Sequence, residues 1–520
     1  MTERLLIIGW DGADWDILHP LRRSGHLPNI DAMLRTGAYG TLSSTIPSHS
    51  WAAWPSFLTG RHPAGHGVFD FVERHPEDPQ RRVPVTSTSI RAETFLERLS
   101  AAGHHVRAAN IPVTYPPIEV KGRMIGGVAI PRGASFVHPR AFASELERRA
   151  QFPVNGMEWG RYRGDPKGLI EEAARLVEQR TASFQVLLEG TWSVAACVYL
   201  APDRLQHPFG AYLLPSHPEY DRLAETPIAE SLREIYRRLD SHLGRLAESC
   251  GPDTTTILMS DHGFRPINRT WNVNRLLQEL GFATSARGAA TSLVRSGTAR
   301  RVARSRVGSA LRRHVRSPAK LDWARTAAYE STLDGGISIN LRGREPEGII
   351  DASDYERVRR ELQGALLAYR DPESGESPVA RVRLKDELAP GPHIDLAPDL
   401  IAEPAPLKDF GHTRELAEWT TWPSGDHRRE GILLASGGRT SGGELPERHI
   451  TDIAATAVAF ADVPSGPIDG TPIKEIAGRD FIRADESDET RVDRGRREDA
   501  MSEADDAYVE QHLRDLGYIE

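Results

Sequence analysis

Four short apolar segments alternate with longer amphipathic segments along the chain. The apolar segments are LLIIG, SVAACVYL, TTILMS and GILLAS, which begin at Leu5, Ser193, Thr255 and Gly431. Apolar runs of this length are typical of strands that are buried on both faces. Segments between them, such as AETFLERLSAAG and ESLREIYRRLDSHLGRLAES, have apolar residues at helical spacing. The alternation predicts an α/β fold with a central, mostly parallel sheet flanked by helices on both faces.

Each of the first three predicted strands is followed by an aspartate. Asp11 comes directly after the first strand, Asp203 follows the second after a short loop, and Asp261 follows the third. Ligand sites of open α/β sheets form at the carboxyl ends of the strands. One aspartate at such a place is commonly only a turn or capping residue. Three of them, each with other polar ligand types close by, indicate a functional site.

Three histidines accompany these carboxylates. His207 lies four residues after Asp203 in APDRLQHP, so on a helical turn the two side chains would share one face. His262 directly follows the third aspartate in MSDHGF, and His427 lies shortly before the fourth strand. Each pattern alone is common, and a lone histidine is usually structural. His412 in DFGHT competes with His427, which we prefer because it precedes a predicted strand of the sheet.

Ser50 begins a segment, SWAAWPSFLTG, whose spacing predicts a helix ended by a glycine. A serine at a helix N-terminus is most often only a cap. The same position also suits a phosphate nucleophile, because free backbone N–H groups and the helix dipole favour an anion there. A bound metal ion would lower the pKa of the hydroxyl and activate it.

Three aspartates, three histidines and one serine together form a candidate metal site. Hard oxygen and borderline nitrogen ligands of this kind suit Zn²⁺, with Mn²⁺ as the alternative. Two divalent ions close together would clamp the attacking and leaving oxygens of an in-line displacement at phosphorus. We therefore expect two divalent metal ions as cofactors.

Composition fits an ordinary globular protein and argues against several other classes. The 520 residues carry a formal net charge of -8, so we expect no nucleic-acid polymer as a partner. The two cysteines, Cys197 and Cys250, exclude a disulfide framework. No apolar run is long enough for a signal peptide or a transmembrane segment. These observations predict a cytoplasmic location and leave the oligomeric state open.

We expect one catalytic domain over residues 1–476 with two cap-type insertions. One lies at about 72–190, which also holds part of the sheet, and the other at about 283–325. Up to Leu321, the second insertion contains ten Lys or Arg residues and no Asp or Glu. We interpret it as a solvated insertion, with binding to a membrane surface or an acidic partner as the alternative. Residues 477–520 predict a charged linker followed by a C-terminal helix.

The order of these motifs resembles that of the alkaline phosphatase superfamily, in its branch of type I phosphodiesterases and nucleotide pyrophosphatases. The resemblance runs from about Leu5 to Pro472 and implies an alkaline-phosphatase-like fold. The family's nucleophile is a Thr or Ser nine residues before the Thr of a TG pair, which a HG pair follows. Here the two pairs begin at Thr59 and His66, which places the nucleophile at Ser50.

By this resemblance, each of two metal ions has its own set of protein ligands. The first set is Asp203, His207 and His427. The second set is Asp11, Asp261 and His262, with the Ser50 oxygen also bound.

The resemblance implies a metal-dependent hydrolase that cleaves phosphodiester or pyrophosphate bonds of small-molecule phosphate esters. Ser50 would attack phosphorus and expel the leaving group, and water would then hydrolyse the seryl-phosphate intermediate. The alternatives are a phosphomonoesterase or phosphonate hydrolase on the same core, a phosphoryl-group transferase, and a binding module without activity. All seven metal-core positions are filled, which favours an enzyme over the last of these.

One position departs from the family pattern. Nucleotide pyrophosphatases carry an Asn shortly after the HG pair that donates to a phosphate oxygen, and the matching residue here is Phe71. We expect Phe71 and Trp51 to offer an apolar wall to the substrate, with core packing as the alternative. A monoesterase usually needs an extra cationic group near the nucleophile. Ser50 is followed by Trp51, Ala52 and Ala53, so we expect diesters or pyrophosphates to be preferred over monoesters.

Overall fold

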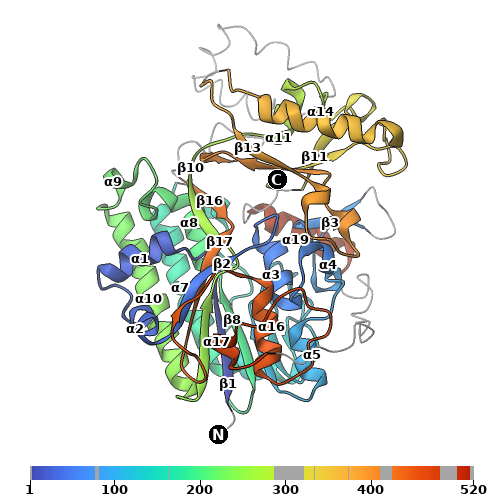
Figure 1. The fold of residues 1–520 in the computed structure, drawn as a ribbon. Coiled ribbons are helices and arrows are strands. Elements are labelled where there is room, and N and C mark those ends of the chain that lie inside the picture. The colour runs from blue at the N-terminus through green and yellow to red at the C-terminus, as the bar shows by residue number, and fades with distance from the viewer. Residues whose placement is uncertain are drawn as a thin grey trace. The chain divides into compact units, whose positions relative to one another are not determined.

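In the computed structural model, the chain forms two compact units (Figure 1). It describes residues 3–75, 81–162, 164–285, 321–332, 334–372, 374–409, 424–480 and 501–515. The larger unit comprises Met1–Arg269, Lys385–Ala397 and Trp419–Glu520, and the smaller unit comprises Thr270–Leu384 and Pro398–Glu418. The basic part of the predicted insertion at 283–325 and the candidate ligand His412 lie outside the described residues.

The larger unit is built around a ten-stranded sheet whose centre is parallel. In spatial order, the parallel centre is β9 (Thr254–Met259), β1 (Arg4–Trp10), β8 (Val194–Tyr199), β5 (Val106–Ala109) and β6 (Gly122–Ile125). Beyond β9 lie β17 (Glu430–Ser436), which is antiparallel to its neighbours, and β2 (Ala38–Ser43), and beyond β6 lies β7 (Val137–His138). The short strands β18 (Gly443–Glu444) and β19 (Arg448–His449) both pair with β2. The predicted α/β fold with a mostly parallel sheet is confirmed.

The four strands predicted from apolar runs are adjacent in this sheet, in the order β17, β9, β1 and β8. Every residue of β8 and β9 is buried, as are all residues of β1 after the first. Continuous apolar sequences arise because helices cover both faces of the sheet and leave no strand face to water.

Two layers of helices cover the faces of the sheet (Figure 1). One layer contains α1 (Trp15–Arg23), α2 (Pro28–Thr36), α7 (Pro166–Leu187), α8 (Ala201–Leu213) and α10 (Pro227–Cys250), with α6 (Arg140–Arg149) packed on α7. The other layer contains α3 (Ser50–Thr59), α4 (Pro63–His66), α5 (Phe95–Ala101), α16 (Thr451–Phe460) and α17 (Lys474–Ala477). Every residue of α3 and α16 is buried, which explains why most residues of these helices are apolar.

The range 72–190 contributes directly to the main sheet. It supplies β5, β6 and β7, together with a hairpin of β3 (Val72–Arg74) and β4 (Arg82–Pro84). The strands β5 and β6 have only four residues each, so their sequences VRAA and GRMI carry little periodicity. The strand β5 belongs to the sheet because it pairs in parallel with β8, and β6 belongs to it because it pairs in parallel with β5.

In its described residues, the smaller unit contains a four-stranded antiparallel sheet and helices packed on it. Its strands, in spatial order, are β11 (Ala328–Thr332), β12 (Gly336–Ile339), β14 (Leu400–Pro404) and β13 (Val379–Leu384). The helices are α11 (Val273–Glu279) and α14 (Tyr355–Ala368). Leu277, Leu362 and Leu400, each fully buried, belong to its apolar core.

The C-terminal helix α19 (Glu503–Asp515) packs on the larger unit. Val509 and Leu513 are buried, and Arg81 pairs with Asp506 at 2.9 Å. Among the described residues, no helix combines the length and the apolar character needed to span a membrane.

Candidate metal centre

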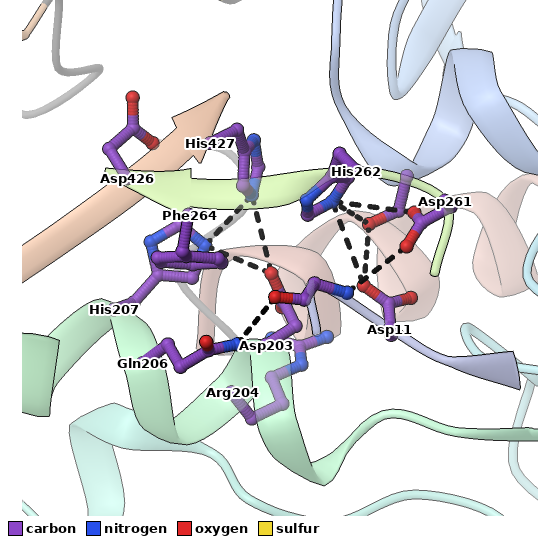
Figure 2. Close-up of polar contacts among 12 residues, drawn as sticks. Asp11, Asp203, Arg204, Gln206, His207, Asp261, His262, Phe264, Asp426 and His427 are labelled. Atoms are coloured by element: carbon purple, nitrogen blue, oxygen red, sulfur yellow. Dashed lines mark hydrogen bonds and ion pairs between the residues drawn. The ribbon is translucent and has the colours of Figure 1, made fainter. Parts of the chain in front are cut away.

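The structure brings all seven predicted residues together at the carboxyl edge of the central strands; Figure 2 shows six of them. The candidate metal centre consists of Asp11, Ser50, Asp203, His207, Asp261, His262 and His427. Asp11 directly follows β1, Asp203 lies in the first turn of α8 after β8, and Asp261 follows β9. Because β8, β1 and β9 are parallel neighbours, their carboxyl ends meet at one edge of the sheet.

Ser50 lies among the ligand candidates that follow β1 and β9. Its Oγ is 3.2 Å from Oδ1 of Asp11, to which it donates a hydrogen bond, and 3.2 Å from Nε2 of His262. Nε2 of His262 also lies 3.3 Å from Oδ2 of Asp261. Asp11, Asp261 and His262 each offer one ligand atom, and these three atoms lie within 4.8 Å of one another. This geometry suits a cation placed next to the serine hydroxyl.

Asp203 stands between two histidines. Its Oδ1 lies 3.3 Å from Nε2 of His207 and 3.3 Å from Nε2 of His427, and the two histidine nitrogens are 3.0 Å apart. The helical spacing of Asp203 and His207 therefore places both side chains on one face, as the sequence predicts. Ligand atoms of Asp203, His262 and His427 also lie within 4.8 Å of one another, so this group adjoins the one around Ser50.

Asp426 is a further acidic residue at the centre that the sequence analysis missed. One of its oxygens lies within 4.8 Å of ligand atoms of His207 and His427. Its position directly before His427 was the available signal. The carboxylate pairs with Nη2 of Arg265 at 2.8 Å, and Figure 2 shows it directed away from Asp203.

A glycine turn allows the aspartates to approach one another. Gly12 follows Asp11 with a φ of 67°, in the left-handed region that favours glycine. A Cβ there would lie 3.0 Å from the Phe264 ring and 3.2 Å from Cα of Asp203. The N–H of Gly12 donates to Oδ1 of Asp261 at 3.1 Å, and its carbonyl accepts from Nε2 of Gln206 at 2.8 Å. The turn after β1 is thus bound to both neighbouring ligand segments.

Helix α3 places the nucleophile candidate and also fixes one ligand candidate. Ser50 is its first residue and is fully buried, as is Trp54 one turn later. The indole Nε1 of Trp54 donates to Oδ2 of Asp11 at 2.9 Å. Asp11 is therefore held by α3 through one oxygen, while its other oxygen faces Ser50.

Burial and like charges raise the proton affinity of two of the carboxylates. Burial, reinforced by the charges of Asp261 and Asp203, raises the pKa of Asp11 well above its ordinary value. Burial raises the pKa of Asp261 to about 7. Burial alone would also raise the pKa of Asp203, but the facing His207 and His427 hold it well below its ordinary value. Burial likewise lowers the pKa of His262, which favours the neutral imidazole that binds metals.

The donor set fits divalent cations. Three carboxylates with no exposed surface face one another, and buried charges normally require a counter-charge or a metal. Within the described part of the chain, Oδ2 of Asp203 is buried without a hydrogen-bond partner. Carboxylate oxygens together with imidazole nitrogens are the ligands of Zn²⁺ and related ions. We therefore assign this cluster as a candidate metal-binding site.

The two aromatic residues expected to face the substrate, Trp51 and Phe71, contact each other with tilted rings. The ring centroids of Trp51 and Phe71 are 4.4 Å apart, and those of His49 and Phe71 are 5.0 Å apart. Trp51 and Phe71 are 1% and 3% exposed. Their contact with a substrate stays a prediction.

The fold of the chain is similar to that of solved structures. Phosphonoacetate hydrolase from Sinorhizobium meliloti 1021, in complex with phosphonoacetate, aligns with a TM-score of 0.55 at 18% identity over 88% of this chain and 96% of that chain. Murine ectonucleotide pyrophosphatase / phosphodiesterase 5 aligns with a TM-score of 0.52 at 13% identity over 90% of this chain and 97% of that chain. At these identities the likeness shows the fold. No curated protein sequence matches the chain.

The sequence itself carries the signature of a family. The model described as type I phosphodiesterase / nucleotide pyrophosphatase matches residues 5–428, a range that contains every residue of the candidate metal centre. The family consists of metal-dependent hydrolases of phosphoric esters. The chain is therefore an enzyme that belongs to the type I phosphodiesterase / nucleotide pyrophosphatase family.

Proposed function

We propose that this enzyme hydrolyses phosphodiester or pyrophosphate bonds of small-molecule substrates through a covalent intermediate on Ser50. The observation that carries the proposal is the place of the Ser50 hydroxyl. Its Oγ lies 3.2 Å from both Asp11 and His262, at the first residue of α3.

The candidate metal centre would hold two divalent cations, Zn²⁺ by preference and Mn²⁺ as the alternative. Asp203, His207 and His427 would bind one ion, and Asp11, Asp261 and His262 the other, with Ser50 beside it. When bound, these ions supply positive charge that activates the serine hydroxyl and stabilises the departing oxygen.

In the first step, Ser50 Oγ forms a bond to phosphorus while the bond from phosphorus to the leaving oxygen breaks. In the second step, the oxygen of a water molecule bonds to phosphorus and Ser50 Oγ departs, which restores the free hydroxyl. Asp11 accepts a hydrogen bond from Ser50 and so orients the hydroxyl before attack. The N-terminal dipole of α3 favours the negative charge of the phosphoryl group that Ser50 would carry.

The surroundings of Ser50 support a substrate with a singly charged phosphoryl group. Trp51, Ala52 and Ala53 follow Ser50 in α3 and carry no charge. A monoester would bring an additional negative charge toward three buried carboxylates, which would require an additional cation. We therefore rank diesters and pyrophosphates above monoesters.

The test is a side-by-side assay on matched nitrophenyl phosphodiester and phosphomonoester substrates, a nucleotide pyrophosphate, and phosphonoacetate. Phosphonoacetate is included because phosphonoacetate hydrolase shares the fold. The proposal expects the highest kcat/KM on the diester or the pyrophosphate. A monoester preference of about a hundredfold, roughly 2.7 kcal/mol of transition-state discrimination, would overturn it. Cleavage of phosphonoacetate alone would replace it with phosphonate hydrolysis.

A further inference from the structure

We propose that the ion pair between the buried Asp14 and the partly buried Arg428 is a positioning device for the metal centre. It binds together the three chain segments that carry Asp11, His262 and His427. Neither residue of the pair is itself a candidate ligand. The inference rests on the proposed function, because it assumes that these segments hold metal.

Asp14 connects the segment after β1 to the segment after β9. It caps the N-terminus of α1, where its Oδ1 accepts from the N–H of Asp16 at 2.7 Å. Its Oδ2 accepts from the N–H of Phe264 at 2.7 Å, two residues after His262. Asp14 has no exposed surface. Its carboxylate therefore spans two ligand-bearing segments that lie 250 residues apart in sequence.

Arg428 brings the third segment to the same carboxylate. Its Nε lies 2.7 Å from Oδ2 of Asp14, and its Nη2 lies 2.5 Å from Oδ1. Two parallel hydrogen bonds of this kind fix the orientation of both partners as well as their distance. Arg428 directly follows His427, so the pair restrains the backbone of that ligand.

The strand register around the pair supports the same role. In β10 (Gly263–Thr270) and β16 (Ser424–Arg428), Gly263 lies opposite Arg428 and Phe264 lies opposite His427. A Cβ at Gly263 would come within 2.5 Å of Oδ2 of Asp14, so glycine is needed for the carboxylate to reach this place.

Asp14 also acts on the histidines through Phe264. The Phe264 ring packs edge-on against His207 at 4.8 Å and against His427 at 5.5 Å between ring centroids (Figure 2). The N–H of Phe264 is the one that Asp14 binds. Loss of the pair would therefore loosen the packing that sets the ring planes of two ligand candidates.

Ser260 ties the same three segments at a second point. Its Oγ donates to the carbonyl of Ala13 and accepts from the N–H of Ile432, both at 2.8 Å. Ser260 is fully buried and directly precedes Asp261. The Asp14–Arg428 pair and Ser260 thus connect the ligand-bearing segments at two separate points, and replacing residues that support metal ligands commonly changes metal affinity by about 10–100-fold.

The smaller unit offers a matched control for the experiment. Arg344 pairs with Asp399 through two nitrogens at 2.8 and 2.6 Å. The arginine side chain is 28% exposed and the aspartate 0% in both pairs. Arg428→Lys and Arg344→Lys each retain the charge but cannot form the two parallel bonds. The two variants therefore impose the same chemical change in two different places.

The experiment uses metal-stripped full-length protein. It measures Zn²⁺ dissociation constants by competition with a chromophoric chelator, the Tm of the metal-free protein, and kcat and KM after reloading. Arg428→Lys should weaken binding of at least one Zn²⁺ by about 10–100-fold, while Arg344→Lys should stay within about twofold of wild type. Asp14→Asn, which keeps the side-chain shape, should behave like Arg428→Lys and replaces it if that variant does not fold.

Three outcomes would contradict the inference. Arg428→Lys and Asp14→Asn could bind Zn²⁺ as tightly as wild type, which would overturn the positioning role alone. Equal weakening in Arg344→Lys would show a general effect of stability and would also overturn it. A wild-type protein that binds no divalent metal would overturn the proposed function, and the inference with it.

Discussion

Two clusters of polar side chains in this protein are built around buried aspartates. They differ in what neutralises the negative charge of those aspartates. Asp399, in the smaller unit, accepts from the N–H of Ile339 at 2.8 Å, from two nitrogens of Arg344 and from the hydroxyl of Tyr355 at 2.7 Å. In the candidate metal centre, three carboxylates face one another and share mainly histidines as partners. The aspartates in question are Asp11, Asp203 and Asp261.

The difference separates a structural cluster from a functional one. The Asp399 cluster brings its own cation, and its hydrogen bonds are made by the protein, so it connects β12, α14 and β14 without a ligand. Among the described residues, no Lys or Arg lies within hydrogen-bond distance of Asp11, Asp203 or Asp261 in the metal centre. Burial and then repulsion by Asp261 and Asp203 raise the pKa of Asp11, and a bound divalent ion would compensate the charge. Asp14 resembles Asp399 in its partners although it lies beside the metal centre.

The largest expected effect is the loss of turnover in Ser50→Ala. The variant removes the proposed nucleophile, and kcat should fall by more than about a thousandfold. Metal content and the Tm should stay near the wild-type values, because the hydroxyl makes only two contacts at 3.2 Å. Steady-state kinetics with elemental analysis measures both. Ser48→Ala, two residues earlier, is the control and should retain activity; near-wild-type activity of Ser50→Ala would refute the nucleophile assignment.

Removal of metal should loosen one cluster and leave the other unchanged. At a metal concentration about a thousand times the dissociation constant, binding contributes about 4 kcal/mol to stability. Chelation should therefore speed amide hydrogen exchange near Gly12 and Phe264, whose N–H groups bond to Asp261 and Asp14. Exchange at Ile339, which bonds to Asp399, should not change. Uniform acceleration in both regions, or none in either, would remove the distinction between the clusters.

Arg344→Ala should destabilise the Asp399 cluster and leave the metal centre unchanged. It leaves a fully buried carboxylate at Asp399 without its cation, which should lower the free energy of unfolding by about 3 kcal/mol. This free energy lies at the low end of the range for a broken buried ion pair, because Ile339 and Tyr355 still donate hydrogen bonds to Asp399. Zn²⁺ affinity should not change. Urea denaturation and chelator competition measure the two effects.

The control for Arg344→Ala is Arg342→Ala. Arg342 pairs with Asp351 at 2.7 Å, but the two side chains are 61% and 55% exposed. An exposed pair contributes about 1 kcal/mol or less. Equal destabilisation by the two variants would mean that burial does not set the strength of the Asp399 cluster.

A further expected effect is a pH dependence that belongs to the metal centre. Burial raises the pKa of Asp261 to about 7 in the metal-free protein, from 3.8. Between about pH 4 and 7 the folded state holds a proton that the unfolded state has released, so stability should fall as pH rises through this range. Metal must displace that proton, so affinity should fall by about tenfold for each pH unit below 7. Asp261→Asn should weaken the stability trend, and Asp11, whose pKa is also raised, should account for what remains; an unchanged trend in that variant would assign it to another group.

Strand positions and most ligand candidates could be read from the sequence because each depends on local signals. The runs that became β1, β8, β9 and β17 are apolar throughout, since both faces of the sheet are covered. Asp203 and His207 share a face because four residues make one helical turn. The strands of 72–190 carried a weaker signal, because four-residue strands such as β5 depend on pairing with β8 for their place.

The sequence by itself determined the α/β class, the family, and which side chains meet at the carboxyl edge of the sheet. These features could be predicted because strand ends, helical turns and individual motifs are each defined by residues that are close in sequence. Only the tertiary structure decided the supporting contacts. Asp14 and Arg428 lie 414 residues apart, and no local pattern links them. Their pairing follows from the parallel order of β1 and β9 and from the β10–β16 register, which are properties of the folded chain.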